Sequence, residues 1–299
     1  MTRALNWFDS NGVTERNVVV AYGNEQAHSL FYACFAVRRL IVQIYVIQTP
    51  LEAEGLIELD VDHIGSVILS EEQWMLPRLK DTVQVIKPTA AKSSLIPLFN
   101  NPDSVLRTLE YYQPDIVHFC EALAGEGGFW DFVDNLIGLQ QDVKKHFPQI
   151  KIMRSIPIAP SGADDKIPTL EYARRFEPVS DFFLTDTLLV KPAGIPDGRQ
   201  PVQGFVGITG KTCNWETAAR LVDASGIPVI LAGGISPQNV IDGILRVKPA
   251  GIDSCTWTNA QDKSGGPIRF KKDLGKVRQL VAHVRQAEKL LQSRLSIQL

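Results

Sequence analysis

Residues 203–240 read QGFVGITGKTCNWETAARLVDASGIPVILAGGISPQNV: a glycine-bearing loop, a helix, an apolar strand, a second glycine loop and a second helix. The strand at residues 227–231 leads into Gly233-Gly234, and glycine lets a backbone approach a ligand closely. Ser236-Pro237 is expected to open the second helix, with Ser as its N-cap and Pro at its first position. Because backbone N–H groups at such helix starts bind anions, this stretch predicts a phosphate-binding edge of an α/β protein.

The same order of strand and helix recurs along the chain. Apolar, β-branched runs predict eight strands, at residues 40–47, 62–69, 82–86, 115–120, 150–156, 181–185, 227–231 and 251–255. Helical patterns follow them, at residues 50–58, 71–79, 103–111, 128–145, 169–176, 215–223, 237–247 and 272–291. Eight parallel βαβ units in about 250 residues favour a closed (β/α)₈ TIM barrel. An open doubly wound sheet is the alternative, but no GxGxxG motif follows the first strand.

Residues 39–299 are expected to form this barrel as one domain, after an N-terminal extension at residues 1–38. The extension contains an apolar run at 17–22 and a helical pattern at 25–39. We expect it to cover the barrel floor or to mediate association, so a homodimer is compatible with the sequence.

Charge and cysteine usage exclude several classes of protein. A formal net charge of -2 argues against nucleic acid as a partner. No apolar run reaches the ~18 residues of a membrane span, and the N-terminus lacks a signal-peptide core, so we expect a cytoplasmic protein without membrane contacts. The four cysteines are widely spaced without a CxxC pair, so neither a disulfide framework nor a metal site is indicated, and no cofactor is expected.

Two consecutive motifs in the second half resemble the phosphoribosylanthranilate isomerase family of tryptophan biosynthesis. Residues 207–215, GITGKTCNW, are similar to the family's GGTGKTFDW, and residues 228–240, PVILAGGISPQNV, to its PVILAGGLNPENV. Residues 251–253, GID, resemble the family's GVD, and earlier strands match weakly in register. The resemblance spans residues 40 to 284 and implies a TIM barrel that converts a phosphorylated amino-aldose into an amino-ketose, an Amadori rearrangement.

The resemblance also implies two catalytic groups. Asp186, at the end of the sixth strand, matches the general acid that opens the ribose ring. Tyr45 stands where the family has its general base, a Cys. Because a Tyr with a pKa of about 10 is a poor base at pH 7, we expect a hydrogen-bond donor, a ligand wall or a packing residue there. Cys120, at the end of the fourth strand, is a candidate substitute base, and a small buried thiol is the alternative.

Four glycines are expected to bind phosphate through their backbone N–H groups: Gly207, Gly210, Gly233 and Gly234. The family completes this site with an SSG segment, and Thr256 is expected to donate a hydroxyl there. Trp257 stands near the position of the family's glycine, where an indole would narrow the pocket or stack on a ligand. A nucleotide P-loop is excluded because Phe205 stands where that motif needs glycine.

Two further residues are candidates for contacts with the substrate. Arg154 lies inside the fifth strand and is costly to bury unpaired, so an inward Arg154 would bind a substrate carboxylate or Asp186. Glu121 follows Cys120 and would contact substrate or act as a base from that side. Two functions remain open: an isomerase with a displaced base, and a barrel that binds a phosphorylated or other anionic small molecule without that chemistry.

Overall fold

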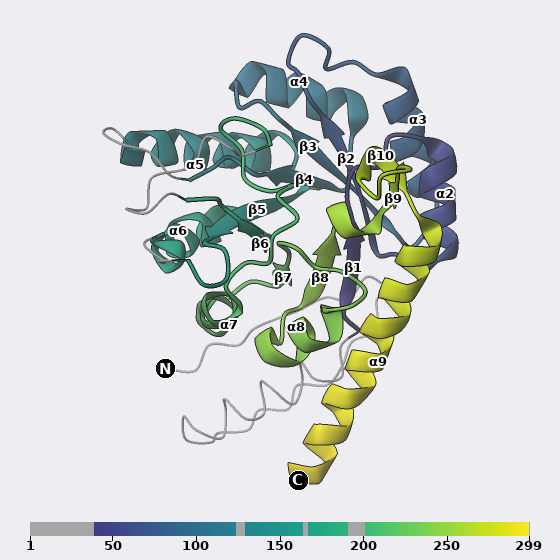
Figure 1. The fold of residues 1–299 in the computed structure, drawn as a ribbon. Coiled ribbons are helices and arrows are strands. Elements are labelled where there is room, and N and C mark those ends of the chain that lie inside the picture. The colour runs from purple at the N-terminus through teal and green to yellow at the C-terminus, as the bar shows by residue number, and fades with distance from the viewer. Residues whose placement is uncertain (1–38, 124–128, 164–166, 191–200, 299) are drawn as a thin grey trace, which may run out of the picture.

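A computed structural model describes residues 39–123, 129–163, 167–190 and 201–298 (Figure 1). Within these ranges, eight parallel strands close into a barrel in chain order, which confirms the predicted (β/α)₈ fold. The strands are β1 (Ile41–Ile44), β2 (His63–Ile68), β3 (Lys92–Pro97), β4 (Ile116–Phe119), β5 (Lys151–Ile158), β6 (Phe182–Thr187), β7 (Val229–Leu231) and β8 (Gly251–Ser254).

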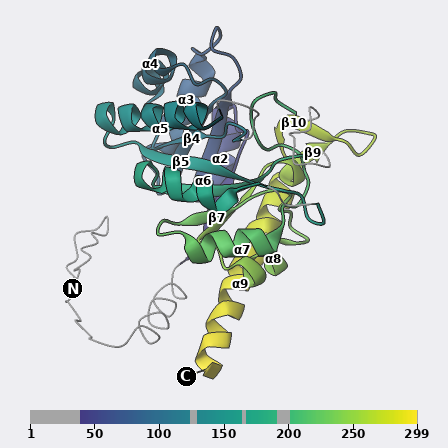
Figure 2. The same cartoon turned by 90° about the vertical axis from the view of Figure 1, so that its left-hand side faces the viewer.

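Helices surround the strands on the outside of the barrel (Figures 1 and 2). They are α2 (Pro50–Glu58), α3 (Pro77–Ile86), α4 (Pro102–Tyr112), α5 (Phe129–His146), α6 (Thr169–Phe176), α7 (Trp215–Ala224), α8 (Val240–Val247) and α9 (Leu274–Gln298). Several begin where the sequence predicts: Thr49 and Asn101 cap α2 and α4, each directly before a proline. No helix in the described part of the chain is both long and apolar enough to cross a membrane.

Alternate residues of each strand face the barrel interior or the surrounding helices. In β5, Met153 and Ser155 contact interior side chains, whereas Ile156 packs in the apolar cluster beneath α5 and α6. Gln43 in β1 and Tyr45, directly after this strand, point inward and bond to groups of other strands. The interior therefore contains a polar layer, and the main apolar cores lie between the barrel and its helices.

The predicted third strand is wrong. Residues 82–86 belong to α3, where Leu79, Val83 and Ile86 are buried at helical spacing, and the helix predicted at 71–79 begins only at Pro77. The actual strand, β3, contains Ser93 and Ser94, whose side chains are buried in hydrogen bonds. An apolar face at helical spacing was mistaken for a strand because the real strand carries small polar residues.

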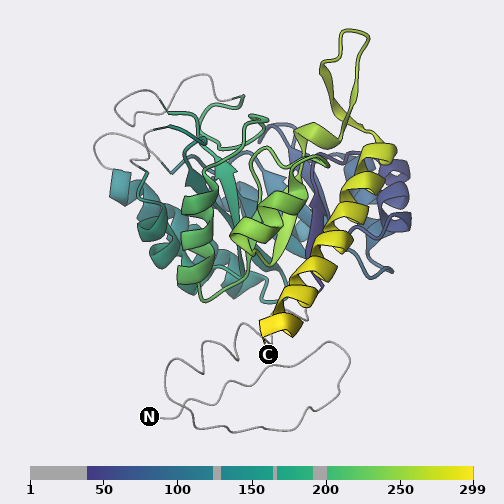
Figure 3. The same cartoon turned by 60° about the horizontal axis from the view of Figure 1, so that its bottom comes forward.

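Two regions lie outside the eight βα units. The extension at residues 1–38, with the helix expected at 25–39, lies outside the described residues. Between β8 and α9, strands β9 (Asn259–Gln261) and β10 (Pro267–Lys272) form an antiparallel hairpin that stands away from the barrel (Figure 3). Lys272 anchors it, since its buried Nζ donates to Asn259 Oδ1 at 2.6 Å and to the Cys255 carbonyl at 2.8 Å.

Candidate active site

The connection from β6 to α7 crosses the carboxyl ends of β4 and β5. The Val206 N–H donates to the Cys120 carbonyl at 2.8 Å, and the Ala122 N–H donates to the Gly204 carbonyl at 2.8 Å. Further along, the Ser161 N–H donates to the Thr212 carbonyl at 3.0 Å. These backbone bonds fix the first glycine loop over the mouth of the barrel, the end at which TIM-barrel enzymes carry their active sites.

Asp186 lies beneath this loop, near the carboxyl end of β6. The carboxyl accepts the Thr187 N–H at 2.8 Å. Gly207 presses on it from above: a Cβ at that position would come within 2.3 Å of Asp186 Oδ2. Desolvation raises the pKa of Asp186 to about 7, although the Thr187 N–H opposes this rise. The side chain stays partly open to the cavities beside it, so Asp186 can exchange a proton with a ligand near neutral pH.

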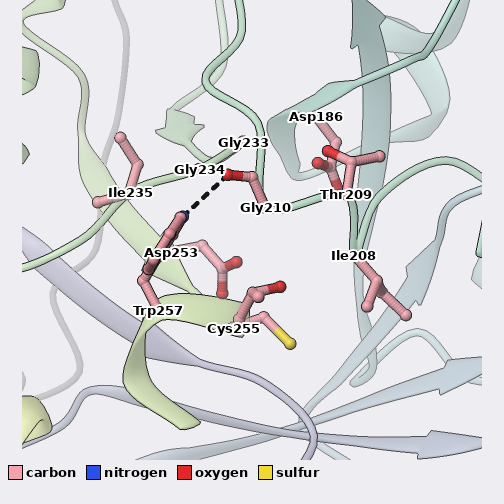
Figure 4. Close-up of a pocket in the computed structure, with 11 residues that line it drawn as sticks. Asp186, Ile208, Thr209, Gly210, Gly233, Gly234, Ile235, Asp253, Cys255 and Trp257 are labelled. Atoms are coloured by element: carbon pink, nitrogen blue, oxygen red, sulfur yellow. Dashed lines mark hydrogen bonds between the residues drawn. The ribbon is translucent and has the colours of Figure 1, made fainter. Parts of the chain in front are cut away.

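Two cavities meet at Asp186. A polar cavity is lined by both glycine loops and by the segment after β8 (Figure 4). Its lining includes Thr209, Gly210, Gly233, Gly234, Ile235, Thr256 and Trp257. An apolar cavity is lined by Tyr45, Val46, Val67, Ile96, Leu98, His118, Cys120, Leu184, Val202, Phe205, Val206 and Gly207. Both cavities also touch Asp186, Ile208, Asp253 and Cys255, so these four residues form the boundary between them.

The glycine loops pack against each other at the polar cavity. Gly234 has a φ of 66°, and a Cβ there would lie 2.5 Å from the Thr212 backbone nitrogen, so this close approach requires glycine. The prediction that Ser236-Pro237 opens α8 is wrong, because the helix begins at Val240. The Asn239 side chain closes a turn instead: its Oδ1 accepts the Ser236 N–H at 2.8 Å, and its Nδ2 donates to the Gly234 carbonyl at 2.9 Å.

Trp257 forms one wall of the polar cavity. Its Nε1 donates to the Gly210 carbonyl at 2.9 Å (Figure 4). The Thr256 side chain lies against the same glycine. The indole is 47% exposed, so one surface remains open to solvent. The residue therefore ties the segment after β8 to the first glycine loop and narrows the polar cavity.

Tyr45 is held inside the barrel by its own contacts. Its hydroxyl is hydrogen bonded to Ser94 Oγ at 2.5 Å and to His118 Nδ1 at 2.8 Å. The ring packs on Gly65, where a Cβ would lie 2.0 Å from the ring. Burial raises the pKa of Tyr45 well above its usual value, so the phenol stays protonated. These contacts make Tyr45 a wall of the apolar cavity with its hydroxyl engaged on both sides.

His118 and Cys120 reach the apolar cavity from β4 and the residue after it. His118 Nε2 bonds Ser155 Oγ at 2.8 Å, so both ring nitrogens have partners. Burial, helped by Arg154, lowers the pKa of His118 to about 3. Burial also raises the pKa of Cys120 well above its usual value, as do the charges of Glu121 and Asp186. Cys120 is therefore a buried thiol at neutral pH.

Arg154 and Glu121 do not join the site. Since alternate residues of β5 face the interior, Arg154 faces outward, toward α6. Its guanidinium lies 4.4 Å from the centre of the Phe176 ring. Arg154 Nη1 donates to Glu121 Oε2, and both side chains are fully buried. Neither lines the two cavities, so the expectation of an inward Arg154 is wrong, and the substrate contact of Glu121 stays a prediction. A one-residue shift in register moves a strand side chain to the opposite face.

Asp253 is a site residue that the sequence analysis missed. It faces the interior from β8, lines both cavities, and accepts a hydrogen bond from Gln43 Nε2 at 3.3 Å. Desolvation and the charge of Asp186 raise the pKa of Asp253 to about 8. The signal was present in the sequence, because residues 251–253 match the family's GVD and this strand has alternate residues facing inward.

Two residues of the cavity walls carry backbone strain. Val46 (φ 74°) and Ile208 (φ 59°) are left-handed, a region that β-branched side chains rarely occupy. Both stand where the resembled family has glycine, in its VKICGI and GGTGKT segments. The chain therefore keeps the backbone path of these loops and adds two apolar side chains to the cavity walls.

A matched pair of variants measures this strain. Ile208→Gly and Ile208→Ala both remove the side chain, but only glycine relieves the left-handed φ. We expect Ile208→Gly to be about 1 kcal/mol more stable than Ile208→Ala. Urea unfolding of the two variants checks the difference, and an alanine variant of equal or greater stability would show that the loop is not strained.

These features define a TIM barrel whose mouth joins glycine loops to a buried acidic group. A family model described as N-(5'phosphoribosyl)anthranilate (PRA) isomerase matches residues 142–281. N-(5'-phosphoribosyl)anthranilate isomerase 1 of Methanosarcina mazei is 26% identical over 250 residues, which cover 83% of this chain and 86% of that protein. The chain is similar to the phosphoribosylanthranilate isomerase family, most closely in its second half, and these matches support a divergent relationship to it.

Solved structures agree on the fold. The enzyme of Pyrococcus furiosus superposes with a TM-score of 0.55 at 20% identity, covering 83% of this chain and 99% of that one. A phosphoribosyl anthranilate isomerase in complex with reduced 1-(o-carboxyphenylamino)-1-deoxyribulose 5-phosphate superposes with a TM-score of 0.54 at 18% identity, with the same coverage. At these identities the structures support the barrel architecture.

Proposed function

We propose that this protein is an aldose–ketose isomerase of tryptophan biosynthesis that acts on N-(5'-phosphoribosyl)anthranilate. The observation that carries the proposal is the position of Asp186, at the boundary between a cavity of glycine loops and an apolar cavity. The substrate has matching parts: a phosphate for the loops, an aromatic ring for the apolar walls, and a ribose between them.

Asp186 is the general acid in this proposal. Opening the ribose ring requires a proton on the ring oxygen, and a carboxyl with a pKa of about 7 holds one near neutral pH. The backbone N–H groups of Gly210, Gly233 and Gly234 bind the phosphate, with Thr256 beside them. The apolar walls exclude water from the reacting carbons.

A second function has support of its own. Tyr45 replaces the family's base, its hydroxyl is already bonded twice, and Val46 and Trp257 narrow the cavities. These features fit a barrel that binds a phosphorylated small molecule without isomerising it. The cytoplasmic location, a homodimer, and the extension at residues 1–38 are further parts of the proposal that experiments on the whole chain must test.

Turnover separates the two functions. We expect the purified full chain to consume N-(5'-phosphoribosyl)anthranilate, followed by the fluorescence of its anthranilate group. Binding of the substrate without any turnover would reject the isomerase and favour the binding protein. The absence of both binding and turnover would reject the isomerase and would also reject this substrate as the ligand of a binding protein.

A further inference from the structure

We infer that Asp253 is the proton acceptor of this barrel, and that it takes the C2 proton of the substrate while Asp186 protonates the ring oxygen. The inference rests on the proposed isomerase function and names the base that replaces the family's strand-one Cys. It moves that role from β1 to the neighbouring strand β8.

The position of Asp253 supports this role. β8 pairs directly with β1, and Asp253 lies in register with Gln43. Gln43 is the inward residue that precedes Tyr45. The carboxyl lies at the boundary between the two cavities, where Asp186 also lies. Gln43 Nε2 holds Oδ1 at 3.3 Å, and within the described residues no hydrogen bond engages Oδ2. One oxygen is therefore oriented while the other is available to a ligand.

The other titratable groups that line the cavities are poorly placed to act as bases. Tyr45 and His118 bond each other, and each has a serine as its second partner. Cys120 reaches only the apolar cavity, and burial keeps it a thiol. Cys255 reaches both cavities, but burial raises the pKa of its thiol to about 11. Apart from Asp186, Asp253 is the one acidic side chain among the described residues that line the cavities.

Two neighbouring carboxyls can hold one proton between them. The pKa of Asp186 is raised to about 7 and that of Asp253 to about 8, and the charge of Asp186 is one cause of the second value. Between these values the pair carries a single proton, shared between the two groups. Because the pKa of Asp253 is the higher of the two, the proton lies more often on Asp253, and the reaction uses the less populated state with Asp186 protonated and Asp253 ionised.

The steps then balance without any further reactant. Asp186 gives its proton to the ring oxygen as the C1–O bond breaks, which leaves a C1=N iminium. Asp253 takes the C2 proton, the C2–H electron pair forms the C1=C2 bond, and the C1=N pair returns to nitrogen. Asp253 then returns its proton to C1 while the enol O–H proton passes to Asp186, which gives the C2 ketone. Both carboxyls regain their starting states.

Asp253→Asn tests the assignment, with Asp103→Asn, at an exposed position of α4, as the matched control. We expect kcat to fall about 10²–10⁴-fold in Asp253→Asn while KM changes little, because the base acts on the reacting carbon. With substrate deuterated at C2, the isotope effect on kcat should increase in this variant, which a merely structural defect would not cause. Asp103→Asn should match the wild type.

The outcomes distinguish this inference from the proposed function. A wild type without turnover overturns the proposed function, and the inference falls with it. A wild type that turns over while Asp253→Asn keeps its kcat within fivefold overturns the inference alone. Loss of turnover in Cys120→Ser, with Asp253→Asn unaffected, would likewise overturn it and assign the base to Cys120.

Discussion

Replacing Asp186 by Asn is expected to reduce turnover of N-(5'-phosphoribosyl)anthranilate about 10²–10⁴-fold without loss of the fold. An amide cannot deliver a proton to the ring oxygen, but it keeps the shape of the carboxyl beneath Gly207 and its contact with the Thr187 N–H. The measurement is kcat by anthranilate fluorescence. A variant with wild-type kcat would remove Asp186 from the mechanism.

Stability provides the control for this variant. The pKa of Asp186 rises from an unfolded value near 3.9 to about 7 in the fold, so the folded state binds its proton more tightly. Its contribution to stability is complete below pH ~4 and is lost as pH rises through about 7. Asp186→Asn should therefore melt at a higher temperature than the wild type at pH 8, and the difference should narrow toward pH 4. Lower stability at pH 8 would attribute lost turnover to misfolding.

The wild-type pH profile follows from the same pair. Activity requires one proton on Asp186 and Asp253 together, and their pKa values are raised to about 7 and about 8. We expect a narrow bell-shaped profile of kcat/KM between these values.

The glycine loops and Asp186, which the structure brings together at the barrel mouth, are encoded in short windows of sequence. Gly207 and Gly234 must be glycine, because a Cβ would collide with Asp186 at the first position and with the Thr212 backbone at the second. The glycines of the sequence motif are therefore the ones that the packing of the loops requires. Asp186 follows from its place near the end of a strand that the resemblance aligns. The closed barrel follows from the alternation of strands and helices, which survives the misplacement of one strand.

The parts that the sequence did not predict depend on register and on distant partners. Arg154 was expected inside the barrel, yet its neighbours Met153 and Ser155 hold the inward positions. Asp253 becomes a candidate only when β8 closes the barrel beside β1 and brings its carboxyl to the cavities of Asp186. The outward direction of Arg154 and the position of Asp253 cannot be derived from residue propensities, because both depend on the final register of the paired strands.

The buried ion pair outside the barrel leads to the largest expected effect on stability. Glu121→Ala leaves the Arg154 guanidinium buried without its carboxylate, which we expect to cost about 3–5 kcal/mol in urea unfolding. The Phe176 ring, whose centre lies 4.4 Å from the guanidinium, still contacts it in this variant, but the ring cannot replace the negative charge of the lost carboxylate.

A double variant separates the loss of the ion pair from the loss of packing. Within the described residues, Arg154 Nε and Nη2 and Glu121 Oε1 already lack hydrogen-bond partners, so the wild-type pair is incompletely compensated. Glu121→Leu combined with Arg154→Met should therefore recover most of the stability that Glu121→Ala loses, because it removes both charges and fills the space. Asp134→Ala, which breaks a surface pair with Arg175, is the control and should cost less than about 1 kcal/mol. A loss of stability in Glu121→Ala no larger than in this control would mean that water reaches Arg154. The strand register that directs Arg154 away from the site would then be wrong.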